Sequence, residues 1–309
     1  MPSSAPKLST PLTKLFGINH PVMLAAVTNA GGIGVMEGSD REIKAHLEDP
    51  NAPFGVDLLI PQVGGQARKT NLPELTDVII QGGAKLFVCA VGVPPKEMVD
   101  KLHAAGIVVM KYHVGHPKHV PKALAQGVDV ICAQGGEGGG HTGETPFSVL
   151  IPAVIDLCRT ARSPLTGEPV IVVAAGGIAD GRGLAAAFAY GAAGVWVGTR
   201  FVASEEAGAP KVHKDLVLSA GGRPMHVRKT AYVASWCVWC GGRKIPNEVE
   251  LEQHPEKSME SRMWLMGKVA GSIKDIKPAK EIVDELVNTA VASIQGSSHF
   301  VLRKPSCDY

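Results

Sequence analysis

The sequence lacks the features that direct a chain to a membrane or to secretion. No apolar run approaches the roughly 18 residues that a bilayer-crossing helix needs, and the polar stretch 1–10 carries no apolar signal-peptide core. The charges nearly balance, with 31 Lys and Arg residues against 29 Asp and Glu residues, so no surface for a polyanion is expected. We therefore predict a cytoplasmic protein with no membrane contact and no nucleic-acid partner.

Cysteine and aromatic residues are also scarce. Six cysteines are present, and Cys237 and Cys240 form a single Cys-x-x-Cys pair without the second pair of a zinc ribbon. Reduced thiols and no metal are the simpler expectation. Aromatic residues make up 5% of the chain, whereas glycine accounts for 36 of its 309 residues. This composition suits helices packed closely on a sheet, and a chain of this length can bury a large core.

Short apolar runs alternate with helical segments over most of the chain. We expect strands at 21–26, 32–36, 54–60, 85–91, 107–112, 128–133, 170–174 and 194–197. We expect helices between them at 40–47, 71–81, 94–105, 118–126, 147–161 and 181–190. Regular alternation implies a parallel sheet, and eight such units favour a (β/α)₈ TIM barrel of the α/β class.

The first two expected strands lie close together in the sequence. A parallel crossover normally needs about a dozen residues or more, so the barrel should have a shortened first βα unit. An open doubly wound sheet is the alternative fold. The first strand lacks the Gly-x-Gly-x-x-Gly turn that the dinucleotide-binding form of that fold requires.

Three regions are expected along the chain. Residues 1–19 form an N-terminal arm, residues 20–208 the barrel core, and residues 209–309 a C-terminal helical cap or lid packed on the barrel. Helices of the last region are predicted at 209–220, 248–268 and 276–294. A partner-binding surface is the alternative role for this region.

The stretch after the expected strand at 128–133 is rich in glycine and contains one imidazole. Residues 133–143 read Ala-Gln-Gly-Gly-Glu-Gly-Gly-Gly-His-Thr-Gly. Glycines at this density let backbone N–H groups approach a flat or anionic ligand, and His141 can change its protonation state near neutral pH. A flexible linker with an incidental histidine is the alternative interpretation.

Two further glycine turns are expected at the same end of the barrel. Gly176 and Gly177 follow the seventh strand, and Gly198 and Thr199 follow the eighth. Loops at these two places in TIM barrels frequently bind phosphate. Arg200 is either a counter-charge for this anion or part of a structural ion pair. An anion site and an imidazole at one end of a barrel suit a phosphorylated planar cofactor, FMN.

Segments 133–143, 169–207 and 271–287 resemble the nitronate monooxygenase family, and the similarity runs from about residue 20 to residue 294. The resemblance implies an FMN-dependent oxidoreductase built on a TIM barrel. It also implies a set of cofactor-binding residues, namely Met23, Asp57, Gln134, Gly135, Gly138, Gly139, Gly140, Gly176, Gly177, Trp196, Val197, Gly198 and Thr199.

The same resemblance implies that His141 is the catalytic residue beside the flavin. It would remove the proton next to the nitro group of a nitroalkane, and O₂ would complete the oxidation to a carbonyl compound and nitrite. A base with a pKa near neutrality suits deprotonation of carbon, while the flavin carries the redox chemistry. Two alternatives are an NAD(P)H-dependent reductase of an enoyl thioester or quinone, and a non-catalytic flavin-binding protein.

The chain departs from the family pattern at three places near the expected flavin ring and substrate. The opening Ala-Pro-Met turn is absent, and Met23 stands nearest to its position. Asp57 replaces an asparagine, and Lys268 replaces a glutamine. These changes leave the phosphate end of the pattern intact, so the substrate is less well defined than the fold and the cofactor.

Charged residues after the fifth strand supply further candidates. Lys111 and His113, together with Lys268, are the predicted substrate-binding residues. For Lys111, at the end of the fifth strand, a surface charge is the alternative. His116 and His119 follow at a spacing that a metal site can use, but a solvated loop is the preferred interpretation. The expected partners are a small-molecule substrate and O₂, and a homodimer is the oligomer we consider.

Overall fold

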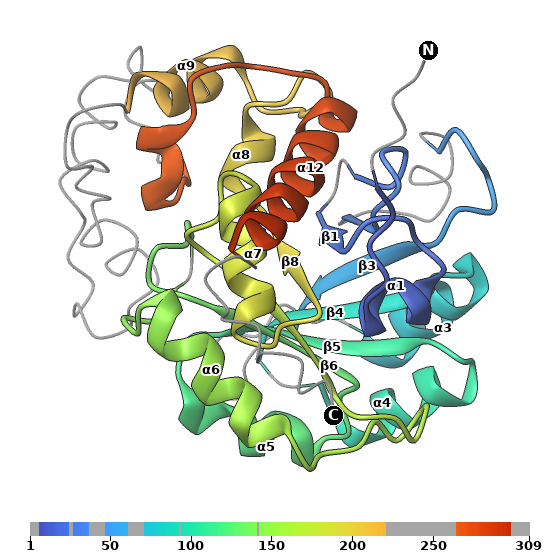
Figure 1. Ribbon diagram of the computed structural model, residues 1–309. Coiled ribbons are helices and arrows are strands. Elements are labelled where there is room, and N and C mark those ends of the chain that lie inside the picture. Colours follow the sequence, from blue (N-terminus) through green and yellow to red (C-terminus); the bar gives the residue numbers. More distant parts are fainter. Residues whose placement is uncertain are drawn as a thin grey trace, which may run out of the picture.

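The computed structural model describes residues 6–24, 27–36, 47–60, 71–92, 94–140, 142–220 and 264–297. Eight parallel strands form one sheet in the order β1-β8-β7-β6-β5-β4-β3-β2 (Figure 1). They are β1 (Val22–Met23), β2 (Gly34–Met36), β3 (Phe54–Leu59), β4 (Leu86–Val91), β5 (Val108–Val114), β6 (Val130–Gln134), β7 (Ile171–Ala175) and β8 (Gly194–Trp196). A parallel bridge between Met23 and Ile33 brings β1 and β2 together and nearly closes the barrel. The predicted TIM barrel is confirmed.

Helices surround this sheet. They are α1 (Pro11–Phe16), α3 (Leu72–Gly82), α4 (Lys96–Ala104), η1 (Pro117–His119), α5 (Val120–Ala125), α6 (Phe147–Cys158), α7 (Gly181–Ala189), α8 (Thr199–Val202), α9 (Lys211–Ser219), η4 (Lys268–Ser272) and α12 (Ala279–Ser297). The helix expected at 40–47 lies outside the described residues except for its last position. Of the helix expected at 248–268, only 264–268 is described, and it is not helical before η4 begins.

The link between β1 and β2 is short, as the sequence predicts. Its described residues form turns in which the Gly32 N–H donates to the Val27 carbonyl at 3.0 Å and the Ile33 N–H to the Val22 carbonyl at 3.1 Å. A Cβ atom on Gly32 would lie 2.3 Å from the Val22 carbonyl oxygen, so glycine is required where this turn presses on β1.

The segment 11–16 of the expected arm forms helix α1, which covers the amino end of the barrel. Its Leu12 and Phe16 side chains are buried in the cluster that fills the barrel interior. A Cβ atom on Gly194, at the start of β8, would lie 2.4 Å from Cδ2 of Leu12. The interior of the barrel beside Leu12 therefore has no room for one more methyl group at position 194.

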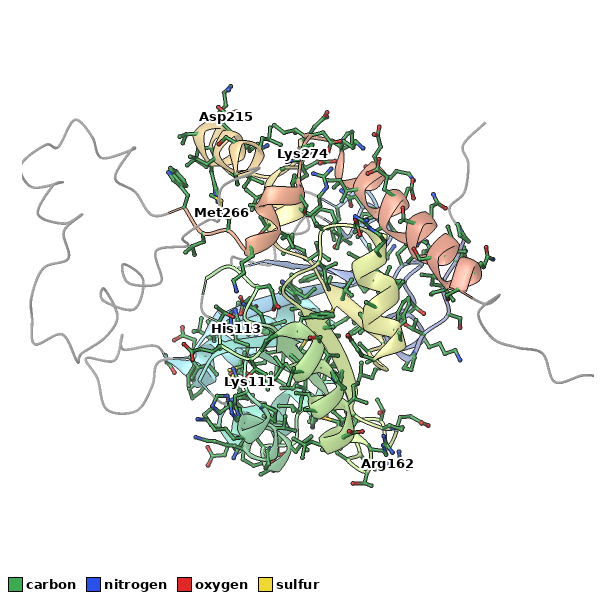
Figure 2. The ribbon with its side chains drawn as sticks, turned by 60° about the vertical axis from the view of Figure 1, so that its left-hand side comes forward. Lys111, His113, Arg162, Asp215, Met266 and Lys274 are labelled. Carbon is green, nitrogen blue, oxygen red and sulfur yellow. The ribbon has the colours of Figure 1, made fainter. Side chains whose placement is uncertain are left out.

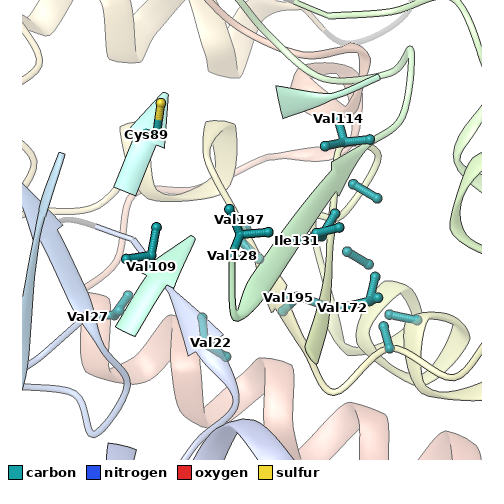
Figure 3. Packing of buried hydrophobic residues seen from close by; sticks show 14 of the residues in the cluster. Val22, Val27, Cys89, Val109, Val114, Val128, Ile131, Val172, Val195 and Val197 are labelled. Atoms are coloured by element: carbon teal, nitrogen blue, oxygen red, sulfur yellow. The ribbon is translucent and has the colours of Figure 1, made fainter. Parts of the chain in front are cut away.

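A second core layer lies between the strands and the helices (Figure 3). Val109, Ile131 and Val172 belong to it, and α12 joins it through apolar residues that include Leu286. A Cβ atom on Gly181 of α7 would lie 2.2 Å from the Leu286 carbonyl oxygen, so α12 and α7 cross closely. Part of the predicted C-terminal cap thus lies in the helical ring, while α9 and η4 form a small separate cluster. In the described part of the chain, no helix is long and apolar enough to cross a membrane.

Candidate functional site

A cavity of about 980 Å³ lies at the carboxyl ends of the strands. The loops that follow β6, β7 and β8 line it, together with 206–209, 265–267 and Val269. Figure 2 shows Met266 above His113 and Lys111, with Arg162 at the far end of the molecule. A cavity of this size, at this end of the barrel, has the place and the volume of a cofactor site.

The glycine-rich loop is shaped by close backbone contacts, so it is not a free linker. A Cβ atom on Gly138 would lie 2.5 Å from Nε2 of Gln134, and one on Gly139 would lie 2.7 Å from the carbonyl carbon of Met266. The buried Gln134 amide donates to the Gly139 carbonyl at 3.3 Å. Glycine is needed here because neighbouring groups already fill the space that a side chain would take.

Glu137 has a structural role within this loop. Its carboxylate accepts from the Phe147 N–H at 3.0 and 3.3 Å, which satisfies a donor at the start of α6. Its carbonyl oxygen accepts from the Lys268 N–H at 2.9 Å, which ties the loop to η4. Glu137 therefore connects the glycine-rich loop to two other elements.

The glycine turns after β7 and β8 leave backbone groups open to the cavity. Gly176 and Gly177 have φ angles of 80° and 73°, a conformation that favours glycine. A Cβ atom on Gly198 would meet nothing within 4 Å, so open space adjoins this position. The Thr199 hydroxyl accepts from the Gly267 N–H at 2.8 Å and keeps its own hydrogen to donate. These groups fit a phosphate, whose oxygens accept hydrogen bonds.

Arg200 does not belong to this cradle. Its guanidinium is buried and forms an ion pair with Asp275 at 2.6 Å, and it also donates to the Asp275 carbonyl at 3.0 Å. Of the two interpretations that the sequence leaves open, the structural ion pair is the one that the structure shows. The pair holds α8 to the segment before α12.

Most of the predicted cofactor-binding residues line the cavity, and so does one predicted substrate-binding residue. The lining members are His113, Gln134, Gly138, Gly139, Gly140, Gly176, Gly177, Trp196, Gly198 and Thr199. The predicted residues that do not line it are Met23, Asp57, Lys111, Gly135, Val197 and Lys268. Met23 is fully buried in the barrel interior, and the Lys268 side chain is exposed to solvent.

His141 lies outside the described residues, whereas both of its neighbours in the chain are described. Gly140 lines the cavity, and the Thr142 hydroxyl donates to the Gly135 carbonyl at 3.0 Å. The catalytic role of His141 stays a prediction.

Lys111 and His113 meet at the end of β5, where the register with β6 shifts. The Lys111 ammonium lies 3.3 Å from the carbonyl oxygens of both Cys89 and Ala90, and burial lowers its pKa. The His113 Nδ1 atom lies 3.2 Å from the same Ala90 carbonyl. Lys111 does not line the cavity, and its ammonium group instead contacts the end of β4.

Sequence reasoning missed several parts of the lining, and two of them show why. Thr28, Asn29 and Ala30 come from the shortened first unit, and Leu265 and Met266 come from the segment before η4. The first group follows the carboxyl end of a strand, which is where ligands of such barrels bind, and this rule could have found it. The second group carries no local signal, because tertiary packing alone brings it to the cavity.

Comparison with known proteins decides the family. The family model described as nitronate monooxygenase matches residues 12–231. The chain belongs to the nitronate monooxygenase family. This family is one of flavoenzymes, and the family predicted from the sequence is confirmed.

Two curated relatives differ in their names. The chain is 36% identical over 234 residues to the 5-hydroxy-7a-methyl-1-oxo-octahydro-1H-indene-4-carboxyl-CoA dehydrogenase of Mycobacterium tuberculosis, covering 70% of this chain and 61% of that protein. It is 34% identical over 225 residues to a nitronate monooxygenase of Neurospora crassa, covering 65% of this chain and 58% of that protein. The chain thus spans about three fifths of the length of these relatives.

Solved structures agree on the fold. FabK from Thermotoga maritima superimposes with a TM-score of 0.73 at 25% identity, covering 95% of this chain and 100% of that one. A nitroalkane oxidase from Streptomyces ansochromogenes gives a TM-score of 0.69 at 20% identity, covering 93% and 99%, which supports the fold alone.

Proposed function

We propose that this chain is an FMN-dependent oxidoreductase that oxidises an acidic carbon compound, a nitronate or a nitroalkane, with O₂. One observation carries this function. Three glycine turns, at 138–140, 176–177 and 198, converge on a single cavity at the carboxyl end of the barrel. Converging backbone donors beside open space are what a flat, phosphorylated ligand requires.

FMN would be held at both of its ends by this chain. Gly177, Gly198 and Thr199 would bind the phosphate through backbone N–H groups and one hydroxyl. The glycine-rich loop and the Gln134 amide, which the Gly139 carbonyl orients, would contact the ring. When bound, FMN would accept the electrons that leave the substrate. Trp196 and Met266, both buried beside the cavity, would keep water from the reacting atoms.

His141 is the proposed base. An imidazole titrates near neutral pH, so its neutral form can take a proton from a carbon acid at physiological pH. Gly140, the residue before it, lines the cavity, and the hydroxyl group of Thr142, the residue after it, donates to the Gly135 carbonyl. The positions of these two neighbours support the choice of His141 as the base.

A thioester is the second candidate substrate. The relative that is 36% identical is named a carboxyl-CoA dehydrogenase. The carbon next to a thioester carbonyl is also acidic, so the same base could serve both substrate classes. The alternative is a reductase of an enoyl thioester or quinone. In that case electrons would enter the flavin from NAD(P)H and leave to the substrate.

An anaerobic titration of the FMN-loaded protein tests these functions. Loss of visible flavin absorbance on adding nitroethane, or its nitronate, without NAD(P)H supports the leading function. The same loss with an acyl-CoA alone moves the assignment to the thioester. Bleaching by NADPH alone supports the reductase, and a protein that takes up no FMN overturns the flavin-dependent function.

A further inference from the structure

Residues 264–268 form a strap that crosses the glycine-rich loop at the edge of the cavity. Leu265, Met266 and Gly267 of this strap line the cavity. A Cβ atom on Gly267 would lie 2.7 Å from the Glu137 carbonyl oxygen, so the strap and the loop touch backbone to backbone. The Leu265 side chain is 45% exposed although it lines the cavity, which places it at the opening. A ligand inside the cavity is therefore bounded by the strap.

Two backbone N–H groups fasten the carboxyl end of the strap. The Gly267 N–H donates to the Thr199 hydroxyl at 2.8 Å. The Lys268 N–H donates to the Glu137 carbonyl at 2.9 Å. Thr199 belongs to the proposed phosphate cradle, so this end of the strap adjoins the place where a phosphate would bind.

The amino end of the strap is held by His213 of α9. The Nε2 atom of His213 lies 3.0 Å from the Leu265 carbonyl oxygen. A carbonyl oxygen can only accept, so Nε2 carries a hydrogen and donates it. The neutral ring with its hydrogen on Nε2 and the imidazolium both donate from this atom, so the contact needs no particular charge on His213. The ring also lies against the Trp264 indole, with 5.1 Å between the ring centroids.

Helix α9 is itself fixed to the barrel. Val217 of this helix and Met266 of the strap belong to the same small apolar cluster. The Lys214 ammonium donates to the Ser204 carbonyl at 2.6 Å, which ties α9 to the chain just after α8. Because α9 is anchored in this way, a hydrogen bond from His213 restrains the strap relative to the barrel.

We propose that His213 is a positioning residue that holds the strap over the bound flavin and slows the release of the flavin from the cavity. This role rests on the proposed function, since it takes FMN to be the ligand. The strap bounds the cavity at its opening, so a ligand leaves faster when the strap moves away more often. Most differences in affinity between related complexes likewise arise in the dissociation rate.

The hold on the strap is tested without FMN. Hydrogen exchange of the Gly267 and Lys268 amides in the full chain reports how often the strap opens. We compare His213→Asn with His213→Gln, because the glutamine side chain can place an N–H donor where Nε2 lies and the asparagine side chain is too short to do so. Exchange at both amides should be roughly two- to tenfold faster in His213→Asn, the loss of about one hydrogen bond, and should stay near the parental rate in His213→Gln.

The release of FMN is tested on the loaded protein. The dissociation rate, followed by the fluorescence that FMN regains after dilution, should rise by a similar factor in His213→Asn and stay near the parental value in His213→Gln. The control is Lys211→Asn, a change at an exposed residue of the same helix that pairs with Asp215 and does not line the cavity. It should leave both the exchange rates and the dissociation rate unchanged.

Equal exchange in the parent and in His213→Asn overturns the proposal, and so does an equal rise in Lys211→Asn or in His213→Gln. Faster exchange with an unchanged dissociation rate of FMN overturns the role of His213 in retaining the flavin. Failure of the proposed function looks different, because the parent protein then takes up no FMN. That result ends the role in retention as well, whereas the exchange comparison still decides whether His213 holds the strap.

Discussion

The two ends of the barrel are built on opposite principles. At the amino end, Asp129 is buried and its carboxylate accepts hydrogen bonds from the Val109 N–H at 2.8 Å and the Ser163 hydroxyl at 2.6 Å. His103 Nε2 adds a contact at 2.8 Å. At the carboxyl end, glycines leave an open cavity, and a strained histidine and a buried lysine share one carbonyl. The Asp129 carboxylate at the amino end finds its hydrogen-bond donors within the protein, whereas the cavity at the carboxyl end keeps donors and acceptors for a ligand.

This difference separates stability from function along the barrel axis. A buried carboxylate is tolerated where hydrogen-bond donors surround it. Through these donors Asp129, which directly precedes β6, links that strand to β5 and to the loop before β7. A site must instead keep donors and acceptors that only a ligand satisfies. Substitutions at the amino end should therefore change stability, and those at the carboxyl end should change binding and rate.

The largest expected effect is on the reaction itself. His141→Asn should lower kcat/KM for a neutral nitroalkane by about 10²- to 10⁴-fold, because the base that takes the proton is removed. The preformed nitronate has already lost that proton, so it should react in the variant at nearly the parental rate. Anaerobic stopped-flow measurement of flavin reduction with both substrates checks this. An equal loss on both would show that His141 does not act as the base.

The next effect is on stability at the amino end. Asp129→Ala should lower the free energy of unfolding by about 3–5 kcal/mol, since it leaves buried donors without their acceptor. Urea denaturation of parent and variant measures the difference. Whatever fraction remains folded should bind FMN with the parental dissociation constant. A loss of FMN affinity with little change in unfolding would reverse the division between the two ends.

Gly194 in β8 and Gly198 in the loop after it provide a matched comparison between effects on stability and effects on FMN binding. Gly194→Ala should cost about 1–3 kcal/mol of stability, because its Cβ would meet the Leu12 side chain at 2.4 Å. Gly198→Val should leave stability nearly unchanged, since open space adjoins Gly198 and its φ of −91° suits a side chain. Its side chain would occupy the proposed phosphate cradle and weaken FMN binding roughly tenfold or more.

Thermal melts and fluorescence titration with FMN separate these two glycine variants. The melts should distinguish Gly194→Ala from the parent, and the titration should distinguish Gly198→Val. If Gly198→Val binds FMN as tightly as the parent, the phosphate lies elsewhere and the cofactor part of the proposed function is wrong.

Sequence patterns predicted the barrel because short apolar runs, which form buried strands, recur along the chain between helical segments. Apolar strands such as 128–133, and the glycine turns that follow the strands, are local signals. Because the carboxyl ends of parallel strands meet at one end of a barrel, these turns could also be predicted to lie together. Helix α1 was placed in an arm, although Thr10 and Pro11 form a capping signal that could have revealed it.

Contacts between distant parts of the chain were beyond sequence reasoning. Arg200 pairs with Asp275, and no spacing rule links residues so far apart in the sequence. The apolar face of α12 predicted a helix, but not that it would pack beside α7 in the ring. The bulge at His113 was also hidden, because register depends on the neighbouring strands. His141, the residue that the sequence marks most clearly, stays a prediction.

The smallest expected effect concerns pH and belongs to the amino end. Burial lowers the pKa of His20 from its ordinary value of 6.5, an effect that Lys280 and Lys7 add to and Asp284 opposes. The folded state therefore prefers the neutral ring, and below about pH 6.5 the unfolded chain binds more protons. The stability that depends on the neutral ring is fully present above that pH and is lost as the pH falls through the lowered pKa.

His20→Asn should accordingly make the free energy of unfolding less dependent on pH between about pH 7 and pH 5. Urea denaturation at several pH values measures the slope for the parent, for this variant and for His116→Asn, whose histidine is exposed. The slope should fall in His20→Asn alone. Flavin reduction at neutral pH should stay at the parental rate, because His20 does not line the cavity. A steeper slope in His20→Asn would mean that the folded state favours the protonated ring, and a slower reduction would mean that the two ends are coupled.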